Sequence, residues 1–403
     1  MAEYNLAVIP GDGVGPEVIA EGRRVLEAIA ASDAGLNFTY TQFPWGSDYY
    51  RETGLLMPED GLQQLRAFDA ILFGAVGDPQ IPDHITLNGL LLPMRRYFDQ
   101  GVCIRPSYLY PGVKSPLEGK KAGEIDLVII RENTEGEYAP VGGRLYPGTP
   151  HEIVIQSNVF TRRGTERIIR AAFEYCVRRN KRNKVTSVTK SNAQAFGMVF
   201  WDEVFQEVAE EYPQIETESL LVDRACMDLV RWPEAFDVMV ASNLFADILS
   251  DIAAVVTGSM GLAPSANINP EREYPSMFEP VHGAAFDITG KGIANPLATI
   301  SAVAMMLDHL GEPDAAKRVD GAVSQCLNQR RVLTPDIGGS ATTTQVGDEV
   351  LRLLGEGGPL TAEGPERALS RLRAKFDVVP DDVSLVDELI EERSQQARKE
   401  GGE

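Results

Sequence analysis

The feature that most restricts the fold of this chain is a repeated alternation between short strand-like runs and longer amphipathic segments. Strand-like runs recur at positions 6–9, 70–73, 127–130, 185–188 and 238–241. The first leads through a glycine-rich turn into a segment whose apolar residues recur at helical spacing from Val18 to Ile29. Short buried strands that alternate with amphipathic helices are typical of an α/β fold. In such folds the loops at the carboxyl ends of the strands carry the ligands, so we expect the chemistry to lie there.

The composition argues against two classes of partner. The 403 residues carry a formal net charge of −21, which repels nucleic acid and anionic membranes. No window approaches the roughly 18 consecutive apolar residues that a membrane-spanning helix needs, and Met1 is followed directly by a strand-like run rather than a basic leader. We therefore expect a soluble cytoplasmic protein that binds neither nucleic acid nor membrane.

The chain changes character near its C-terminus. Residues 355–359 read Gly-Glu-Gly-Gly-Pro, and a charged segment follows them. A capping box at 384–387 predicts one short amphipathic helix in this segment. We expect residues 356–403 to be a charged extension that carries no chemistry.

Asp247 and Asp251 lie four residues apart in an apolar pattern of helical period, so both should project from one face of a helix. Two carboxylates at this spacing repel each other by roughly 0.2–0.5 kcal/mol. Hard divalent cations such as Mg²⁺ or Mn²⁺ are the commonest reason for carboxylates to converge. The pair therefore indicates a metal-binding helix. A solvated acidic face is the alternative, and this pair taken alone favours that alternative in so acidic a chain.

The turn at 11–15 contains three glycines and resembles a dinucleotide-binding loop. Its spacing is G-x-G-x-G-P rather than G-x-G-x-x-G, and Pro16 occupies the start of the helix. No acidic residue ends a clear second strand about twenty residues later. A phosphate-binding loop and a tight strand-to-helix turn are equally good interpretations of this segment.

Three arginines stand at or beside apolar runs: Arg95, Arg105 and Arg131. Arginine is seldom buried without a partner, and its planar guanidinium group suits carboxylates. Together the three could gather a di- or tricarboxylate, although an intramolecular ion pair is the simpler explanation for any one of them. Tyr138 and Lys190 lie near the ends of neighbouring strand-like runs, where they are either ordinary surface residues or acid–base groups whose pKa values cationic neighbours would lower.

Four separated motifs closely resemble the isocitrate/isopropylmalate dehydrogenase family of β-decarboxylating dehydrogenases. They are GDGVGPE at 11–17, RENTEGEY at 131–138, SNLFADILSD at 242–251 and EPVHG at 279–283. The resemblance covers about residues 4 to 355 in the order of the family. Within the family, residues 82–84, 90–96 and 267–270 look most like the branch of tartrate dehydrogenase/decarboxylase and D-malate dehydrogenase.

The resemblance implies an α/β fold that is not a Rossmann domain, with two domains and a cleft between them. Residues 1–102 and 256–355 would form a large cofactor-binding domain, and residues 103–255 a small domain with substrate and metal residues and a dimer interface. The protein would be a homodimer in which a second subunit completes each active site.

The resemblance also implies roles for individual residues. The substrate carboxylates would be held by Arg95, Arg105 and Arg131. Mg²⁺ or Mn²⁺ would be bound by Asp247 and Asp251 together with Asp223 of the second chain. Lys190, also from the second chain, would take the hydroxyl proton, and Tyr138 would protonate the enolate carbon.

The same resemblance points to NAD as the cofactor. The residues implied to bind it are His282, Gly283, Ala284, Ala285, Asp287 and Asn295. Asp287 stands where NAD-dependent members place an aspartate on the ribose hydroxyls, and a carboxylate there would repel the 2′-phosphate of NADP. In this loop Ala284 and Phe286 depart from the small or polar serine and proline that the family usually has.

The branch resemblance implies a small (2R)-hydroxy dicarboxylate substrate, with D-malate or tartrate favoured. Asn88 departs from the pattern, because the branch usually has tryptophan there and isopropylmalate dehydrogenases an acidic residue, on the helix that contacts the substituent at C3. One alternative is 3-isopropylmalate dehydrogenase. Another, from a different functional class, is a non-catalytic regulatory subunit, which would be expected to lack some of the residues named above.

Overall fold

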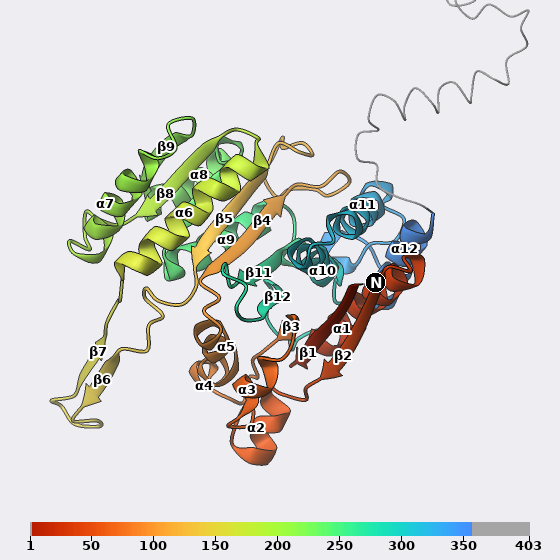
Figure 1. Ribbon diagram of the computed structural model, residues 1–403, viewed down its shortest axis with the longest axis horizontal. Helices are drawn as coiled ribbons and strands as arrows, with labels where there is room; N and C mark the ends of the chain where they lie inside the picture. The colour runs from red at the N-terminus through yellow and green to blue at the C-terminus, as the bar shows by residue number, and fades with distance from the viewer. Residues whose placement is uncertain (1, 357–403) are drawn as a thin grey trace, which may run out of the picture. The chain divides into compact units, whose positions relative to one another are not determined.

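Ten strands form one mixed sheet in the part of the chain that the computed structural model describes, residues 2–356 (Figure 1). The strand order is β2-β1-β3-β12-β11-β4-β5-β10-β8-β9. The strands of this sheet span β1 Ala2–Gly11, β2 Leu36–Gln42, β3 Ala70–Ala75, β4 Val102–Tyr108, β5 Asp126–Glu132, β8 Lys184–Thr189, β9 Glu216–Leu221, β10 Val238–Ala241, β11 Pro264–Ile268 and β12 Ser276–Pro280. All five predicted strands are present.

The sheet consists of two parallel blocks that antiparallel strands join. Strands β2, β1, β3 and β12 pair in parallel, as do β5, β10, β8 and β9. Between the blocks, β11 and β4 run antiparallel to their neighbours. This order differs from that of a Rossmann sheet, which is built from two consecutive parallel halves. The predicted α/β class is confirmed, including the exclusion of a Rossmann domain.

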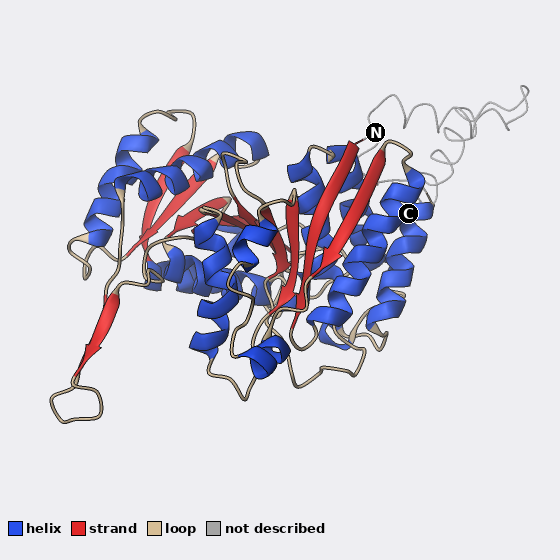
Figure 2. Ribbon diagram, turned by 60° about the horizontal axis from the view of Figure 1, so that its bottom comes forward, coloured by secondary structure: helices blue, strands red, loops and turns tan. Residues whose placement is uncertain are grey.

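Helices cover both faces of the sheet (Figure 2). They span α1 Gly15–Ser32, α2 Ser47–Thr53, α3 Gly61–Leu65, α4 Asp83–Thr86, α5 Leu92–Tyr97, α6 Arg162–Arg179, α7 Gly197–Ala209, α8 Val222–Arg231, α9 Asn243–Val256, α10 Leu297–Leu310, α11 Pro313–Gln329 and α12 Thr343–Gly355. A π-helical turn, η1 Leu87–Leu91, joins α4 to α5. Within residues 2–356, no helix combines the length and the apolar character that crossing a membrane requires.

Each parallel block has its own apolar core. In β1, Leu6 and Val8 face a core shared with α1, α10, α11 and α12, whereas Ala7 and Ile9 face a second core on the opposite side. Both faces of the strand are therefore buried, which explains why its sequence is a continuous apolar run. The other block packs against α6, α7, α8 and α9 around a separate core. One sheet runs through all of these cores, and the division into two domains stays a prediction.

A two-stranded arm projects from the second block (Figure 1). It consists of β6 Gly142–Leu145 and β7 Ile153–Gln156, which pair antiparallel with each other and with no other strand of the described residues. All eight of its strand residues are exposed, including Leu145, Ile153, Val154 and Ile155. The predicted extension at 356–403, with its capping box, lies outside the described residues except for Glu356.

The environment of His309 predicts a loss of stability in acid. His309 is half-buried in α10 and packs against Phe278, with ring centres 5.5 Å apart. Burial, with help from the positive charge of Arg272, lowers the pKa of His309 to about 4. A pKa depressed in the folded state gives stability above the unfolded value, near pH 6.5, that is lost as the pH falls towards 4.

Between pH 7 and pH 4.5 the unfolding free energy of the parent should fall by about 2 kcal/mol more than that of His309→Gln. Urea unfolding at the two pH values measures this difference. His151→Gln is the matched control because His151 lies in an exposed loop. An equal pH dependence in both variants would contradict the assignment.

Candidate active site

Arg105 and Arg131 meet at the carboxylate of Asp247. Cys103 of β4 pairs with Arg131 of β5, so Arg105, two residues further along β4, lies on the same face of the sheet. Arg105 Nη1 donates to Asp247 Oδ1 at 3.0 Å and to Ser250 Oγ at 2.7 Å. Arg131 Nη1 donates to the same oxygen of Asp247. Neighbouring strands thus bring two buried cations to one carboxylate of α9.

Arg131 is held in place by the first residue of α9. Its Nε and Nη2 both donate to Asn243 Oδ1, at 3.1 Å and 2.8 Å. Asn243 Nδ2 donates in turn to the backbone oxygen of Glu135 at 3.0 Å. Buried arginine therefore has the partners that its burial requires, and they fix its guanidinium group in one orientation.

Tyr138 joins the same cluster. Its hydroxyl donates to Asp247 Oδ2 at 2.8 Å, and the guanidinium carbon of Arg131 lies 5.4 Å from the centre of its ring. Burial and the charge of Asp247 raise the pKa of Tyr138 to about 12, against the opposing effect of Arg131. Arg131 and Arg95 lower this pKa, as expected, but burial and the hydrogen-bonded Asp247 carboxylate outweigh them, so the net shift is upward. Tyr138 is consequently held in its protonated, proton-donating form.

Asp251 lies one helical turn beyond Asp247 and is exposed. Burial resists ionisation of Asp247, but the charges of Arg131 and Arg105 hold its pKa well below the usual range. The pKa of Asp251 is raised, first by desolvation and then by the charge of Asp247. Two oxygen donors that repel each other on one helix face fit a divalent cation. Within the described residues, no group of three or more acidic, histidine or cysteine side chains is placed to hold one.

Arg95, the third arginine, is bound by a carboxylate that the sequence did not single out. Its Nη2 donates to Glu279 Oε1 at 2.7 Å, and both side chains are buried. Asn267 Nδ2 donates to the same oxygen at 2.8 Å. The Nε groups of Arg95 and Arg105 are buried without a hydrogen-bond partner among the described residues, so each arginine keeps an unused donor.

Lys190 and Asp223 form a separate pair. Lys190 Nζ lies 2.5 Å from Asp223 Oδ1, and this ammonium group lowers the pKa of the carboxylate. Asp223 is exposed in the first turn of α8. No described ion pair or hydrogen bond connects this pair to Asp247 or Asp251. The structure therefore brings together five of the nine residues predicted for substrate, metal and acid–base roles: Arg105, Arg131, Tyr138, Asp247 and Asp251. Arg95 lies close enough for its charge to act on Asp247 and Tyr138, whereas no described contact links Lys190, Asp223 or Asn88 to this cluster.

The glycine-rich turn packs against the loop predicted to bind the cofactor. Gly11 and Gly13 have φ angles of +68° and +60°, and a Cβ on Gly13 would lie 1.9 Å from the backbone oxygen of Ala284. Val14 N donates to that oxygen at 2.9 Å. The Asp12 carboxylate accepts from Ser47 and from Gly77 N. Since the turn's polar groups are engaged by the protein itself, the tight-turn interpretation is favoured.

The predicted cofactor loop presents exposed groups beyond this contact. Asp287 and Gly283 are exposed, and a Cβ on Gly283 would meet no atom within 4 Å. Ala285 has a φ of +44°, which is uncommon for a residue with a side chain. Burial lowers the pKa of His282, whose Nδ1 lies 3.0 Å from the backbone oxygen of Gly283.

Asn295 differs from the other predicted cofactor residues because its side chain is already bonded. Its Oδ1 accepts from Leu297 N at 3.0 Å, at the start of α10, and its Nδ2 donates to Asp336 at 3.0 Å. The side chain therefore ties this loop to the residues that follow α11. Its role towards a cofactor stays a prediction.

Asn88, the residue predicted to contact the C3 substituent, lies in the π-helical turn η1 and is exposed. Its Nδ2 donates to the backbone oxygen of His84 at 2.8 Å, which leaves its carbonyl oxygen and its second N–H free for a ligand. Leu91, in the same turn, is half-buried.

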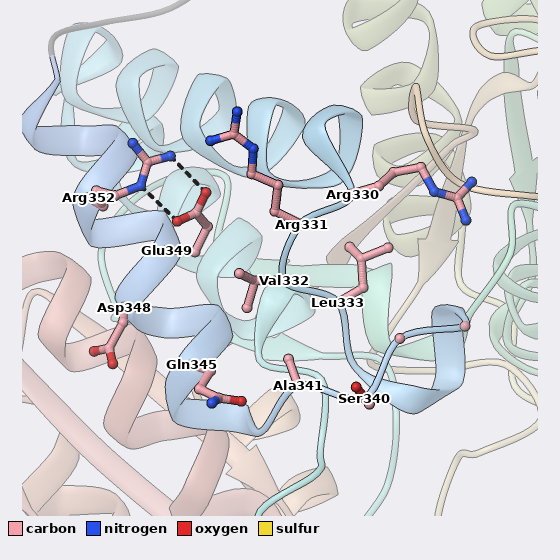
Figure 3. A pocket seen from close by; sticks show the side chains of 12 residues that line it. Arg330, Arg331, Val332, Leu333, Ser340, Ala341, Gln345, Asp348, Glu349 and Arg352 are labelled. Carbon is pink, nitrogen blue, oxygen red and sulfur yellow. Dashed lines mark hydrogen bonds and ion pairs between the residues drawn. The ribbon is translucent and has the colours of Figure 1, made fainter.

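A hollow of about 660 Å³ lies elsewhere, between α12 and the loop that follows α11 (Figure 3). Arg352 and Glu349 form two hydrogen bonds with each other on its α12 side, at 2.7 Å and 2.8 Å. None of the predicted site residues lines this hollow. It is therefore separate from the arginine-rich site.

Two residues of this site were missed in the sequence: Glu279 and Asn243. Glu279 lies within one of the quoted motifs, and Asn243 within another. Their positions next to recognised residues were the available signal. Their partners, Arg95 and Arg131, are remote in sequence, and only the folded sheet shows the contacts.

Three buried arginines, a protonated tyrosine and paired carboxylates on a mixed α/β sheet are typical of an enzyme that handles small anionic molecules. A family model described as isocitrate/isopropylmalate dehydrogenase matches residues 5–350. The chain belongs to the isocitrate/isopropylmalate dehydrogenase family, as its motifs predicted.

Similar proteins and solved structures agree with this placement. The chain is 52% identical to a probable tartrate dehydrogenase/decarboxylase of Agrobacterium vitis over 350 residues, which cover 87% of this chain and 97% of the relative. It is 52% identical over 361 residues to the decarboxylating D-malate dehydrogenase of Escherichia coli K12, covering 88% and 99%. The crystal structure of isocitrate dehydrogenase from Methylococcus capsulatus superposes with a TM-score of 0.78 at 35% identity, covering 87% and 99%. The predicted resemblance to the tartrate/D-malate branch and the predicted fold are confirmed.

Proposed function

We propose that this protein is an NAD-dependent, divalent-metal-dependent dehydrogenase that oxidatively decarboxylates a small (2R)-hydroxy dicarboxylate, with D-malate or tartrate as substrate. The observation that carries the proposal is the convergence of Arg105, Arg131 and Tyr138 on Asp247, with Asp251 one turn away. Similarity to relatives named for tartrate and D-malate supports the choice of substrate.

The arginines are suited to bind the two carboxylates of such a substrate. In the free protein, Asp247 occupies the Nη1 groups of Arg105 and Arg131. The Nε groups of Arg95 and Arg105 are buried and unused among the described residues. A buried donor without a partner costs roughly 1–3 kcal/mol, so a substrate carboxylate that satisfied these donors would recover that energy.

Acid–base chemistry is assigned to Lys190 and Tyr138. When bound, NAD⁺ supplies the hydride acceptor for C2, and the divalent cation supplies charge that stabilises the developing oxyanions. Lys190 Nζ, as the neutral amine, would accept the proton of the C2 hydroxyl. The Tyr138 hydroxyl, kept protonated by Asp247, would give its proton to the enolate carbon that the loss of CO₂ leaves behind.

A homodimer would complete this site. Asp247 and Asp251 have no third acidic partner within the described chain, and Lys190 pairs with Asp223 elsewhere. Several large apolar residues are exposed on the arm and on α8 and α9: Leu145, Ile153, Val154, Met227, Val230, Ile248 and Val255. Exposed apolar surface of this kind marks interaction sites, and a second copy of the chain would cover it while bringing in Lys190 and Asp223.

Two other functions compete with this proposal. Leu91 could offer an apolar wall for the larger substituent of 3-isopropylmalate. A regulatory subunit without activity is disfavoured, because the arginines, Tyr138, Lys190 and the aspartates are all present and five of them cluster.

The deciding experiment measures initial rates of NADH formation with D-malate, L- and meso-tartrate, 3-isopropylmalate and isocitrate, each with Mn²⁺. If the protein turns over none of these substrates, the proposal is refuted.

The preference for NAD⁺ depends on Asp287. Its exposed carboxylate would accept hydrogen bonds from the ribose hydroxyls but would repel the 2′-phosphate of NADP⁺. We expect NAD⁺ to exceed NADP⁺ in kcat/KM by at least about a hundredfold. Asp287→Ala should narrow the gap, mainly by raising KM for NAD⁺, whereas Glu59→Ala, which removes another exposed carboxylate, should not. Equal use of both cofactors by the unaltered enzyme would remove Asp287 from the site.

The choice of substrate depends on the surroundings of Asn88. Its carbonyl oxygen can accept a hydrogen bond from a C3 hydroxyl, but an amide gives no apolar surface to an isopropyl group, whose burial contributes roughly 2 kcal/mol. D-malate should therefore exceed 3-isopropylmalate in kcat/KM, and Asn88→Leu should shift the ratio towards the branched substrate by roughly tenfold. If 3-isopropylmalate is the best substrate of the unaltered enzyme, the leucine-pathway alternative is correct.

A further inference from the structure

Helix α9, which carries Asp247 and Asp251, is capped by a residue from another segment. The N-cap residue is Ser242, but its side chain makes no capping hydrogen bond to the helix. Instead, Leu244 N donates to Glu137 Oε2 at 3.1 Å, and Ser242 Oγ donates to Glu137 Oε1 at 2.8 Å. Both carboxylate oxygens of Glu137 are thus bonded at the positive end of the helix, where an anion is favourable.

Glu137 immediately precedes Tyr138, so one short loop both caps α9 and reaches its next turn. The Tyr138 hydroxyl bonds to Asp247 at 2.8 Å, and Asn243 Nδ2 bonds to the backbone oxygen of Glu135 at 3.0 Å. Gly136 makes the close approach possible. Its φ is +73°, and a Cβ there would lie 3.3 Å from the Cβ of Asn243.

We propose that Glu137 is a positioning residue that fixes the Tyr138 hydroxyl relative to the helix carrying Asp247 and Asp251. Without the Glu137 carboxylate, Leu244 N and Ser242 Oγ lose their acceptors, and the loop keeps only the Asn243 contact to hold it against the first turn of α9. Tyr138 then moves relative to Asp247. This inference rests on the proposed function, in which Tyr138 protonates the enolate carbon.

The reaction offers a readout specific to that proton. Oxidation of D-malate transfers hydride from C2 to NAD⁺ and the hydroxyl proton to Lys190, and it gives oxaloacetate. Loss of CO₂ then gives the enolate of pyruvate, which is trapped when its carbon takes a proton from Tyr138. Until that proton is delivered, the enolate carbon can re-form its bond to the CO₂ still in the site and regenerate oxaloacetate. A displaced hydroxyl delays trapping, so more oxaloacetate is regenerated and leaves the site.

Glu135 provides a matched control. It lies in the same loop and is also partly buried, but its carboxylate accepts from Thr161 N at 2.9 Å and Thr161 Oγ at 2.7 Å, at the start of α6 rather than α9. Glu135→Ala therefore also removes a carboxylate from a helix N-terminus. Its backbone oxygen, which Asn243 uses, is retained.

The test compares Glu137→Ala, Glu137→Gln and Glu135→Ala by rapid quench, separating oxaloacetate from pyruvate. Glu137→Ala should raise the oxaloacetate fraction several-fold and lower kcat by about tenfold or more with little change in KM, because misplacing a reacting group by an ångström is that costly. Glu137→Gln retains an acceptor for Leu244 N and should restore the parent's product ratio. Glu135→Ala should keep the parent's ratio.

A second measurement does not depend on turnover. Binding of Mn²⁺ alone, followed by electron paramagnetic resonance, should weaken by a few-fold in Glu137→Ala and stay unchanged in Glu135→Ala, because only the former loosens the first turn of α9. If the parent enzyme oxidised no hydroxy acid, the proposed function would fail and this titration would still decide the role of Glu137. Parent-like Mn²⁺ affinity together with a parent-like product ratio in Glu137→Ala would overturn the inference. An equal loss of Mn²⁺ affinity or an equal rise in the oxaloacetate fraction in Glu135→Ala would also overturn it.

Discussion

Removal of divalent cations with EDTA should abolish NADH formation, and Asp251→Asn should lower kcat/KM by at least about a hundredfold, because a ligand that stabilises transition-state charge contributes several kcal/mol. The unfolding free energy of the metal-free variant should stay within about 0.5 kcal/mol of the parent. Asp251 is exposed as a residue, but partial burial of its carboxylate and the charge of Asp247 disfavour its ionised form. Folding therefore gains little from its carboxylate.

The measurement combines initial rates across a Mn²⁺ titration with urea unfolding in EDTA. Asp314→Asn is the control, because Asp314 is an almost fully exposed aspartate near the start of another helix, α11. Its rate and its Mn²⁺ dependence should match those of the parent. Parent-like turnover of Asp251→Asn in the presence of chelator would show that the α9 carboxylates bind no catalytic metal, as the alternative of a solvated acidic face predicts.

Mixing two inactive variants should restore activity if the site is shared between subunits. Lys190→Ala removes a residue that would be donated by one chain, and Asp251→Asn removes one that belongs to the other half of the site. After subunit exchange, half of the dimers are hybrids and each hybrid has one intact site, so about a quarter of the parent activity should return. Asp251 is exposed, and its replacement should leave folding and exchange unaffected.

A second mixture controls for non-specific rescue. Lys190 and Asp223 bond to each other and would be donated together, so Lys190→Ala mixed with Asp223→Asn leaves every site of the hybrid defective. No activity should return from this pair. Failure of the first mixture after verified exchange, or an active monomer by light scattering, would show that one chain builds the whole site.

The metal-binding helix could be predicted from sequence because its signal is local. Asp247 and Asp251 share a face whenever residues 243–256 are helical, and the apolar period of this segment specifies the helix. Short buried strands such as β1 were predictable for a related reason, since a strand buried on both faces requires a continuous run of apolar residues. The motifs at the ends of such elements were sufficient to place the chain in its family.

The pairing of charges could not be predicted in this way. Glu279 lies 184 residues from Arg95, and Glu137 lies 105 residues from Ser242. Glu137 and Ser242 meet because they follow β5 and β10, which pair in parallel, and Glu279 lies in β12, which pairs with β3. Apolar periodicity does not encode this order of strands. Nothing local to Arg95 or Ser242 distinguishes these glutamates from the many other acids of the chain.

The protonation of Tyr138 depends on the same long-range geometry. In sequence, Tyr138 lies seven residues from Arg131, and a cationic neighbour predicts a lowered pKa. In the fold, burial and a hydrogen bond to Asp247, 109 residues away in sequence, raise the pKa to about 12 and outweigh the effect of Arg131. The sequence by itself determined which chemical groups the protein has and which local elements carry them. The tertiary structure decided which charge each group faces, because electrostatic effects depend on distances in space that the sheet order sets.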